Sequence, residues 1–157
     1  MKRLIIFLVI LFAAAGSYIS WIFERDSGGV PILTYYQVND IDQNSRTLTV
    51  EQFDAQMKYL VDNGYNILTP TELLDAWQSG GDIPKNSVVI TFDDGHIDVY
   101  KNVFPILKKY NVKATFFLTT DFVNLYPNYV TWDQLREMQA SGLVDIESHT
   151  LNHKRLT

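Results

Sequence analysis

The segment Ser87–His96, SVVITFDDGH, joins an apolar run to two adjacent carboxylates, Asp93 and Asp94, which are followed by Gly95. Aspartate and glycine favour tight turns, so a turn at the end of a strand explains this pattern equally well. The alternative is that one carboxylate binds a metal ion while the other accepts a proton. Metal-ligating residues elsewhere in the chain would favour that alternative.

A second group of ligand-type residues, His149 and His153, lies in the segment SHTLNH near the C-terminal end of the sequence. If the chain forms a helix there, residues four apart share a face and both imidazoles point the same way. Two histidines and one carboxylate are a common zinc ligand set that leaves a coordination position for water. Surface histidine pairs with this spacing also arise by chance, so the combination with Asp-Asp-Gly is more specific than either motif alone.

Both groups follow segments that we predict to be strands. Apolar and β-branched residues predict strands at 31–38, 87–92, 112–120 and 143–150. Helices are predicted at 49–64, 69–77, 99–110, where Pro105 introduces a bend, and 131–142, with threonine N-caps at Thr49, Thr69 and Thr131. Continuous apolar strands separated by helices indicate an α/β fold with a parallel sheet. Sites in such folds form at the carboxyl ends of the strands, which places both groups on one face.

The composition limits the classes of function. The chain has 157 residues, enough for one domain or for part of a larger one, and 46% of them are hydrophobic. A formal net charge of −5 disfavours a nucleic-acid partner, because nucleic-acid binders need a basic surface. The sequence contains no cysteine, which excludes disulfides and thiolate metal sites.

Residues 1–29 are expected to lie outside the folded domain. Lys2 and Arg3 precede 20 uncharged residues, Leu4–Phe23, and 24–29 form a short polar linker. A cleaved secretory signal explains the basic start and the small residues at 13–16. An uncleaved membrane anchor explains the full run, since about 20 apolar residues span a bilayer, and we favour it because the run continues past the possible cleavage site. Both interpretations place the remainder outside the cytoplasm, at the bacterial cell surface.

With these motifs, the sequence resembles the polysaccharide deacetylase family of metal-dependent carbohydrate esterases, which act on chitooligosaccharide, peptidoglycan or poly-N-acetylglucosamine. TFDDG at 91–95 matches the family's first motif, and SHTLNH at 148–153 contains the second, His-Ser/Thr-x-x-His. The segments 102–118 and 131–150 also resemble the elements that connect and follow these motifs. The resemblance implies a domain at 30–157 with a deformed (β/α) barrel, incomplete in this chain because the sequence ends after the second motif.

Carried over position by position, the resemblance implies a role for each motif residue. Asp93 corresponds to the catalytic base, and Asp94, His149 and His153 correspond to the three metal ligands. Thr150 is expected to support its loop by hydrogen bonding. Zinc is the first expectation for the divalent metal, and cobalt, nickel, manganese and iron also suit these ligands. A bound ion acidifies a water and polarises the acetyl carbonyl, and hydrolysis releases acetate from the sugar.

The sequence also departs from the family pattern. Later family motifs carry an arginine, an aromatic residue and a general-acid histidine, and none of them follows before Thr157, so this chain alone is expected to be a poor deacetylase. His96 stands where tyrosine is more usual and is expected to face solvent in a loop. Tyr36 stands where the poly-N-acetylglucosamine deacetylases often have histidine. We expect the core, rather than a sugar platform, to contain the aromatic residues Tyr35, Tyr36, Phe116 and Phe117.

The expected function is metal-dependent removal of N-acetyl groups from an extracytoplasmic N-acetylglucosamine polysaccharide. Poly-N-acetylglucosamine of biofilms is the first candidate substrate, and peptidoglycan or chitin-type polymers are the second. One alternative is a truncated remnant that binds metal or glycan without turnover, since an incomplete barrel exposes a sheet edge. Another is a different metal hydrolase on a similar barrel. The sequence does not define the oligomeric state.

Overall fold

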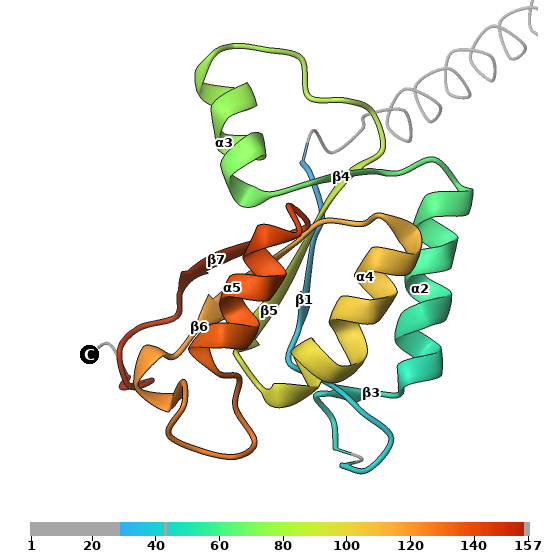
Figure 1. The fold of residues 1–157 in the computed structure, drawn as a ribbon. Coiled ribbons are helices and arrows are strands. Elements are labelled where there is room, and N and C mark those ends of the chain that lie inside the picture. The colour runs from blue at the N-terminus through green and yellow to red at the C-terminus, as the bar shows by residue number, and fades with distance from the viewer. Residues whose placement is uncertain (1–28, 43, 156–157) are drawn as a thin grey trace, which may run out of the picture.

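The computed structural model describes residues 29–42 and 44–155 of the chain (Figure 1). The apolar segment Leu4–Phe23, which we predict to be an anchor or a signal, lies outside the described residues. Among the helices that the structure does describe, none combines the length and apolar character needed to cross a membrane. The boundary near residue 30 therefore stays a prediction.

After three short strands, strands and helices alternate along the chain, as the sequence predicts. The strands are β1 (Ile32–Tyr35), β2 (Gln37–Val38), β3 (Thr47–Leu48), β4 (Asn66–Leu68), β5 (Ser87–Asp94), β6 (Ala114–Leu118) and β7 (Val144–Ser148). The helices are α2 (Val50–Asp62), α3 (Pro70–Gln78), α4 (Phe104–Tyr110) and α5 (Trp132–Ala140), with a π-helix η1 (Val99–Val103) before α4 and a 3-10 turn η2 (Thr120–Phe122) after β6. Figure 1 shows α2, α4 and α5 in a row over the sheet and α3 apart from them.

The main sheet is parallel and has β5 near its centre. Its order is β1-β5-β6-β7, and β4 adds to β5 as a further partner. β4 pairs with the first half of β5, at Ser87–Val89, whereas β6 pairs with the second half, at Thr91–Asp94. β5 is buried up to Phe92, as expected for a strand covered on both faces. The arrangement confirms the predicted α/β fold with a parallel sheet, which represents part of a deformed barrel.

Three helices begin with the capping boxes that the sequence predicts. In each box a threonine hydroxyl accepts a hydrogen bond from a backbone N–H three residues later, and the side chain at that position accepts one from the threonine N–H. The pairs are Thr49 with Gln52, Thr69 with Glu72, and Thr131 with Gln134. Each such cap contributes about 1 kcal/mol, so these polar residues define where the helices start.

The structure differs in detail from the predicted elements. The strand expected at 31–38 is interrupted at Tyr36. Beyond it, β2 pairs with β3 and not with the main sheet, and the Val38 N–H donates a hydrogen bond to the buried carboxylate of Asp98. The helix expected at 99–110 starts as a π-helix, in which Phe104 N–H bonds to the Val99 carbonyl just before the proline of the first α4 turn. β4 was not predicted, since a three-residue strand is too short to show an alternating pattern.

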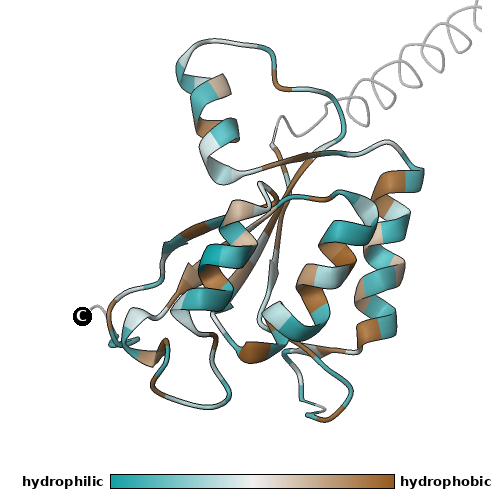
Figure 2. Ribbon diagram, in the orientation of Figure 1, coloured by the Kyte–Doolittle hydropathy of each residue, from teal (hydrophilic) through white to brown (hydrophobic). Residues whose placement is uncertain are grey.

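The core lies between the sheet and α2, α4 and α5, where Figure 2 shows apolar residues on the helix faces toward the strands. Tyr35, only 8% exposed, stacks on Phe92 with ring centroids 5.1 Å apart, and Phe92 packs edge-on against Phe116. These contacts confirm the core position expected for Tyr35 and Phe116, whereas Tyr36 and Phe117 are half-buried. α3 buries no residue and contributes little to this core.

Candidate metal centre

Asp94 ends β5 in a left-handed backbone conformation, which is uncommon outside glycine. Its φ is +71°, and Gly95 follows with φ +81°. A Cβ at Gly95 would lie 2.7 Å from Cδ2 of Leu118, so the turn passes against β6 at a distance that only glycine permits. Successive strand residues normally point to opposite faces. This left-handed turn ends the alternation immediately after Asp93.

The second motif forms a tight turn, not the helix that the sequence analysis considered. Thr150 and His153 both have positive φ, +68° and +56°, and the Thr150 hydroxyl accepts a hydrogen bond of 2.9 Å from the His153 N–H. This bond is the supporting interaction expected of Thr150. The turn is also held from outside, because Asp121 N–H donates to the Leu151 carbonyl at 2.9 Å. The histidines converge through this turn rather than through helical spacing.

The end of β6 joins the two ligand-bearing segments. Leu118 accepts a hydrogen bond of 2.8 Å from the His149 N–H. The next residue, Thr119, is fully buried, and its N–H lies 3.5 Å from the Asp94 carbonyl while its hydroxyl lies 3.5 Å from the His149 carbonyl. Because β6 stands between β5 and β7 in the sheet, it sets the spacing between the first motif and the second.

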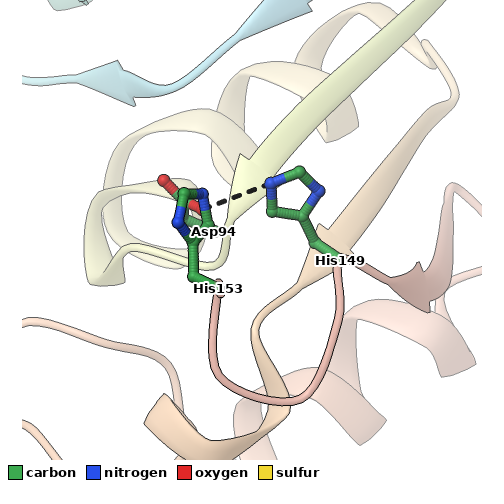
Figure 3. A group of neighbouring side chains, drawn as sticks. All are labelled: Asp94, His149 and His153. Atoms are coloured by element: carbon green, nitrogen blue, oxygen red, sulfur yellow. Dashed lines mark ion pairs between the residues drawn. The ribbon is translucent and has the colours of Figure 1, made fainter. Parts of the chain in front are cut away.

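Asp94, His149 and His153 point toward one another at the carboxyl ends of β5 and β7 (Figure 3). Asp94 Oδ1 lies 3.6 Å from Nε2 of His149 and 3.4 Å from Nε2 of His153. One ligand atom from each residue falls within 4.8 Å of the others. Asp94 Oδ1 is buried and has no hydrogen-bond partner among the described residues. A buried oxygen without a donor is costly, and a cation between it and the two imidazoles would satisfy it.

Asp93 lies beside this group and differs from Asp94 in its environment. Burial raises the pKa of its carboxyl, the negative charge of Asp94 raises it further, and the two histidines oppose the rise. Its side chain makes no hydrogen bond within the described part of the chain. The two carboxylates therefore have different surroundings, one fixed among imidazoles and one half-buried and available to accept a proton.

His96 is not the solvent-facing loop residue that the sequence suggests. Its ring stacks on Tyr129 with centroids 4.8 Å apart, and its Nδ1 lies 3.4 Å from the Gln37 side-chain nitrogen. A backbone bridge between His96 and Tyr129 joins the two segments. The sequence did not single out Tyr129, because no local pattern connects residues so far apart. Burial and the negative charge of Asp94 raise the pKa of its hydroxyl.

Backbone strain is concentrated in these turns. Non-glycine residues with positive φ are sparse, and those that are not asparagine or aspartate cost about 1–3 kcal/mol each. Outside asparagine, the residues of this kind in the described chain are Asp94, Thr150 and His153. Because Asp94 is exempt from this cost, the strain lies at Thr150 and His153. Such strain persists only where surrounding contacts enforce it, so its presence at one candidate ligand and at the residue that hydrogen-bonds it favours a functional role for this geometry.

Comparisons with known proteins identify the family of this chain. The sequence profile of the polysaccharide deacetylase family matches residues 80–157, which contain Asp93, Asp94, His149 and His153. The Bacillus subtilis (strain 168) protein YxkH, whose name describes it as a polysaccharide deacetylase, is 37% identical over 137 residues. The match covers 87% of this chain and 48% of YxkH. The poly-beta-1,6-N-acetyl-D-glucosamine N-deacetylase of Staphylococcus epidermidis is 40% identical over 110 residues, covering 66% of this chain and 37% of that protein.

Solved structures show the same fold. The Streptococcus pyogenes deacetylase PplD, determined in complex with acetate, matches with a TM-score of 0.74 and 32% identity over 80% of this chain and 57% of that one. A de-N-acetylase from Aggregatibacter actinomycetemcomitans matches with a TM-score of 0.71 and 33% identity over 78% and 55% of the two chains. The chain thus spans about half the length, or less, of the relatives it matches. Its motifs, its fold and these similarities together establish that the chain belongs to the polysaccharide deacetylase family and contains part of that family's domain.

Proposed function

We propose that the protein removes N-acetyl groups from an N-acetylglucosamine polysaccharide with the help of a divalent metal ion. The observation that carries the proposal is the convergence of Asp94, His149 and His153 around a buried carboxylate oxygen that lacks a donor. Membership of the polysaccharide deacetylase family supports the reaction class.

The three side chains suit a divalent ion of borderline softness. Two imidazole nitrogens and one carboxylate oxygen form a set that zinc accepts with a coordination position left open, and cobalt, nickel, manganese or iron are alternatives. When bound, such an ion polarises an acetyl carbonyl and makes a water more acidic. Asp94 would hold it through Oδ1, and His149 and His153 through Nε2, since these atoms face one another.

Asp93 is the proposed general base. Its carboxylate lies next to the ligand group without being tied to another side chain, and burial raises its pKa toward the range in which a base accepts a proton from water. In this role Asp93 takes a proton as the water oxygen attacks the acetyl carbon. Asp94 is less suited, since its Oδ1 faces the two imidazoles and would be committed to the bound ion.

Poly-β-1,6-N-acetyl-D-glucosamine is the first proposed substrate. It is the substrate named for the Staphylococcus epidermidis relative, and IcaB from Ammonifex degensii has the same fold, with a TM-score of 0.67 at 29% identity. Peptidoglycan and chitin-type polymers are the second choice. A polymer of this kind lies outside the cytoplasm, which agrees with the proposed secretion signal or anchor at residues 1–29.

The proposed anchor has its own test. A C-terminally tagged protein expressed in a bacterium should stay in the membrane fraction after carbonate washing, because 20 uncharged residues, Leu4–Phe23, suffice to span a bilayer. A secreted product whose N-terminus begins near Gly16 would instead identify a cleaved signal.

The function is tested on the native protein, in the length that its gene encodes. Zinc content after dialysis and acetate release from an N-acetylglucosamine oligomer are measured together. Asp93→Asn should keep the metal and lose about 10²–10⁴ in rate, the usual contribution of a positioned base. A His149→Ala/His153→Ala double variant should lose both metal and activity.

The exposed carboxylate of Asp75 on α3 supplies the control, and Asp75→Asn should retain both properties. Unchanged zinc retention in the double histidine variant would contradict the ligand assignment. Metal retention with no acetate release by the wild type would favour a metal-binding remnant over an enzyme.

A further inference from the structure

The helix α3 stands apart from the other helices, at the end of the sheet opposite the candidate metal centre (Figure 1). It follows β4, which pairs with the first half of β5, and the loop 79–86 joins it to β5. The first residue of β1, Ile32, pairs with Val89, so β1 enters the sheet at this same end. From Ser87 to Asp94, β5 spans about 23 Å at roughly 3.3 Å per residue, and this length separates the two ends.

One side of α3 is held to the rest of the domain. Glu72 accepts a hydrogen bond of 3.0 Å from the Thr69 N–H through one carboxylate oxygen, and its other oxygen forms an ion pair with Lys113, just before β6. Leu73 and Ala76 are half-buried on the same side of the helix. These contacts determine which side of α3 faces outward.

The outward side of α3 carries two exposed apolar side chains. Leu74 is 46% exposed and Trp77 is 75% exposed, and residues three apart lie on one face of a helix. Single exposed apolar residues are ordinary on protein surfaces. Two that share a face, on a helix that buries no residue of its own, indicate a surface that contacts something else in the native protein.

The size and chemistry of this face suit a lipid interface better than a protein partner. A specific protein interface buries about 800 Å² on each side, whereas a tryptophan supplies only about 150–250 Å². Tryptophan is enriched where acyl chains meet lipid headgroups, because its ring is apolar and its indole N–H is a hydrogen-bond donor. Since α3 contains no lysine or arginine, such a contact does not depend on anionic lipids.

The predicted anchor brings a lipid interface close to α3. The uncharged run ends at Phe23, and Ile32, the first residue of β1, follows nine positions later. Fully extended, this stretch of chain spans at most about 30–32 Å. A tether of this length keeps the amino end of the sheet beside the bilayer, and short flexible tethers give effective concentrations in the millimolar range. A contact too weak to hold a free protein on a membrane is then populated.

We propose that α3 lies on the membrane surface, with its axis along the bilayer plane and Leu74 and Trp77 inserted among the lipid headgroups. The proposal rests on the proposed anchor and not on the deacetylase chemistry. The contact turns the carboxyl ends of the strands away from the bilayer. The candidate metal centre then faces a polymer outside the membrane, about the length of β5 from the lipid.

A fluorescent label on α3 tests the contact. This chain contains no cysteine, so Gln78→Cys places a single label beside Trp77. Glu51→Cys places one in the first turn of α2, which starts at the opposite end of the sheet. The native protein is reconstituted in phosphatidylcholine vesicles that contain a nitroxide lipid, which quenches a fluorophore at the membrane surface. Quenching should be stronger at position 78 than at position 51, and added phosphatidylglycerol should not increase it.

Two double variants are compared with the α3 label in place. Leu74→Ala/Trp77→Ala should lower the quenching to the level seen at the α2 label, because the apolar contact is lost. Thr71→Ala/Asp75→Ala, on the polar part of the same helix, is the matched control and should retain the quenching. All four side chains are exposed, so both variants should keep the circular dichroism of the parent protein.

The outcomes separate this contact from the anchor. In a protein that a carbonate wash leaves in the membrane, equal quenching at 78 and 51, or quenching unchanged in the Leu74→Ala/Trp77→Ala variant, overturns the contact and leaves the anchor intact. A label at 78 that neither the nitroxide lipid nor aqueous iodide quenches would show that protein covers α3, and it also overturns the contact. A protein released by the carbonate wash overturns the anchor and the contact together. Acetate release is measured separately, so the proposed deacetylase is judged by its own test.

Discussion

Gly95 follows the candidate ligand Asp94, and its replacement by alanine tests how tightly this turn is packed. Gly95 has φ +81°, where a residue with a Cβ pays about 1–2 kcal/mol. The added Cβ would lie 2.7 Å from Cδ2 of Leu118, which is buried in β6 and has little freedom to withdraw. Overpacking of this kind costs about a further 1–3 kcal/mol. We expect Gly95→Ala to lower the free energy of unfolding by about 2–5 kcal/mol.

Gly142→Ala is the matched control. Gly142 has a similar φ, +72°, but no atom lies within 4 Å of its added Cβ, so only the backbone cost of about 1–2 kcal/mol applies. Urea unfolding followed by circular dichroism, with a chelator present so that bound metal does not contribute, measures both variants. In a double-mutant cycle with Leu118→Ala, the double variant should lose less stability than the sum of the losses in the two single variants, because the shorter side chain at 118 removes the contact. Equal destabilisation by the two glycine changes, together with additivity in the cycle, would refute the reasoning.

The parts of this fold that the sequence predicts are those with local causes. The capping threonines Thr49, Thr69 and Thr131 act on backbone groups only three residues away, so their effect is readable without the rest of the chain. The buried strand β5 is equally clear, because a strand covered on both faces must be apolar throughout. The rule that sites form at the carboxyl ends of parallel strands then explains why Asp94 and His149 come together.

The parts that could not be predicted depend on contacts between distant segments. The turn at Thr150 exists because β6 and η2 hold it from outside, through Leu118 and Asp121, and its sequence alone is equally compatible with a helix. The position of His96 depends on Tyr129, which a loop brings back to β5. The departure of β2 from the sheet depends on Asp98, a carboxylate whose burial no local pattern indicates.

The remaining predictions concern groups that support the site. Burial raises the pKa of Asp98 above its usual 3.8, so the folded state binds this proton more tightly than the unfolded state. The stability of the wild type should therefore fall, relative to Asp98→Asn, as the pH rises from about 4 through the raised pKa. Urea unfolding at pH values between about 3.5 and 7 measures this, and curves of stability against pH that run parallel for the two proteins would contradict it. Thr150→Val keeps the shape of the side chain but removes the oxygen that accepts the His153 N–H at 2.9 Å. We expect zinc to bind this variant about 2–10-fold more weakly in a competition titration, because one lost hydrogen bond loosens the turn that carries a proposed ligand. Thr150→Ser keeps that oxygen and should bind as the wild type does, so equal weakening in both variants would assign the effect to the backbone conformation rather than to the hydrogen bond.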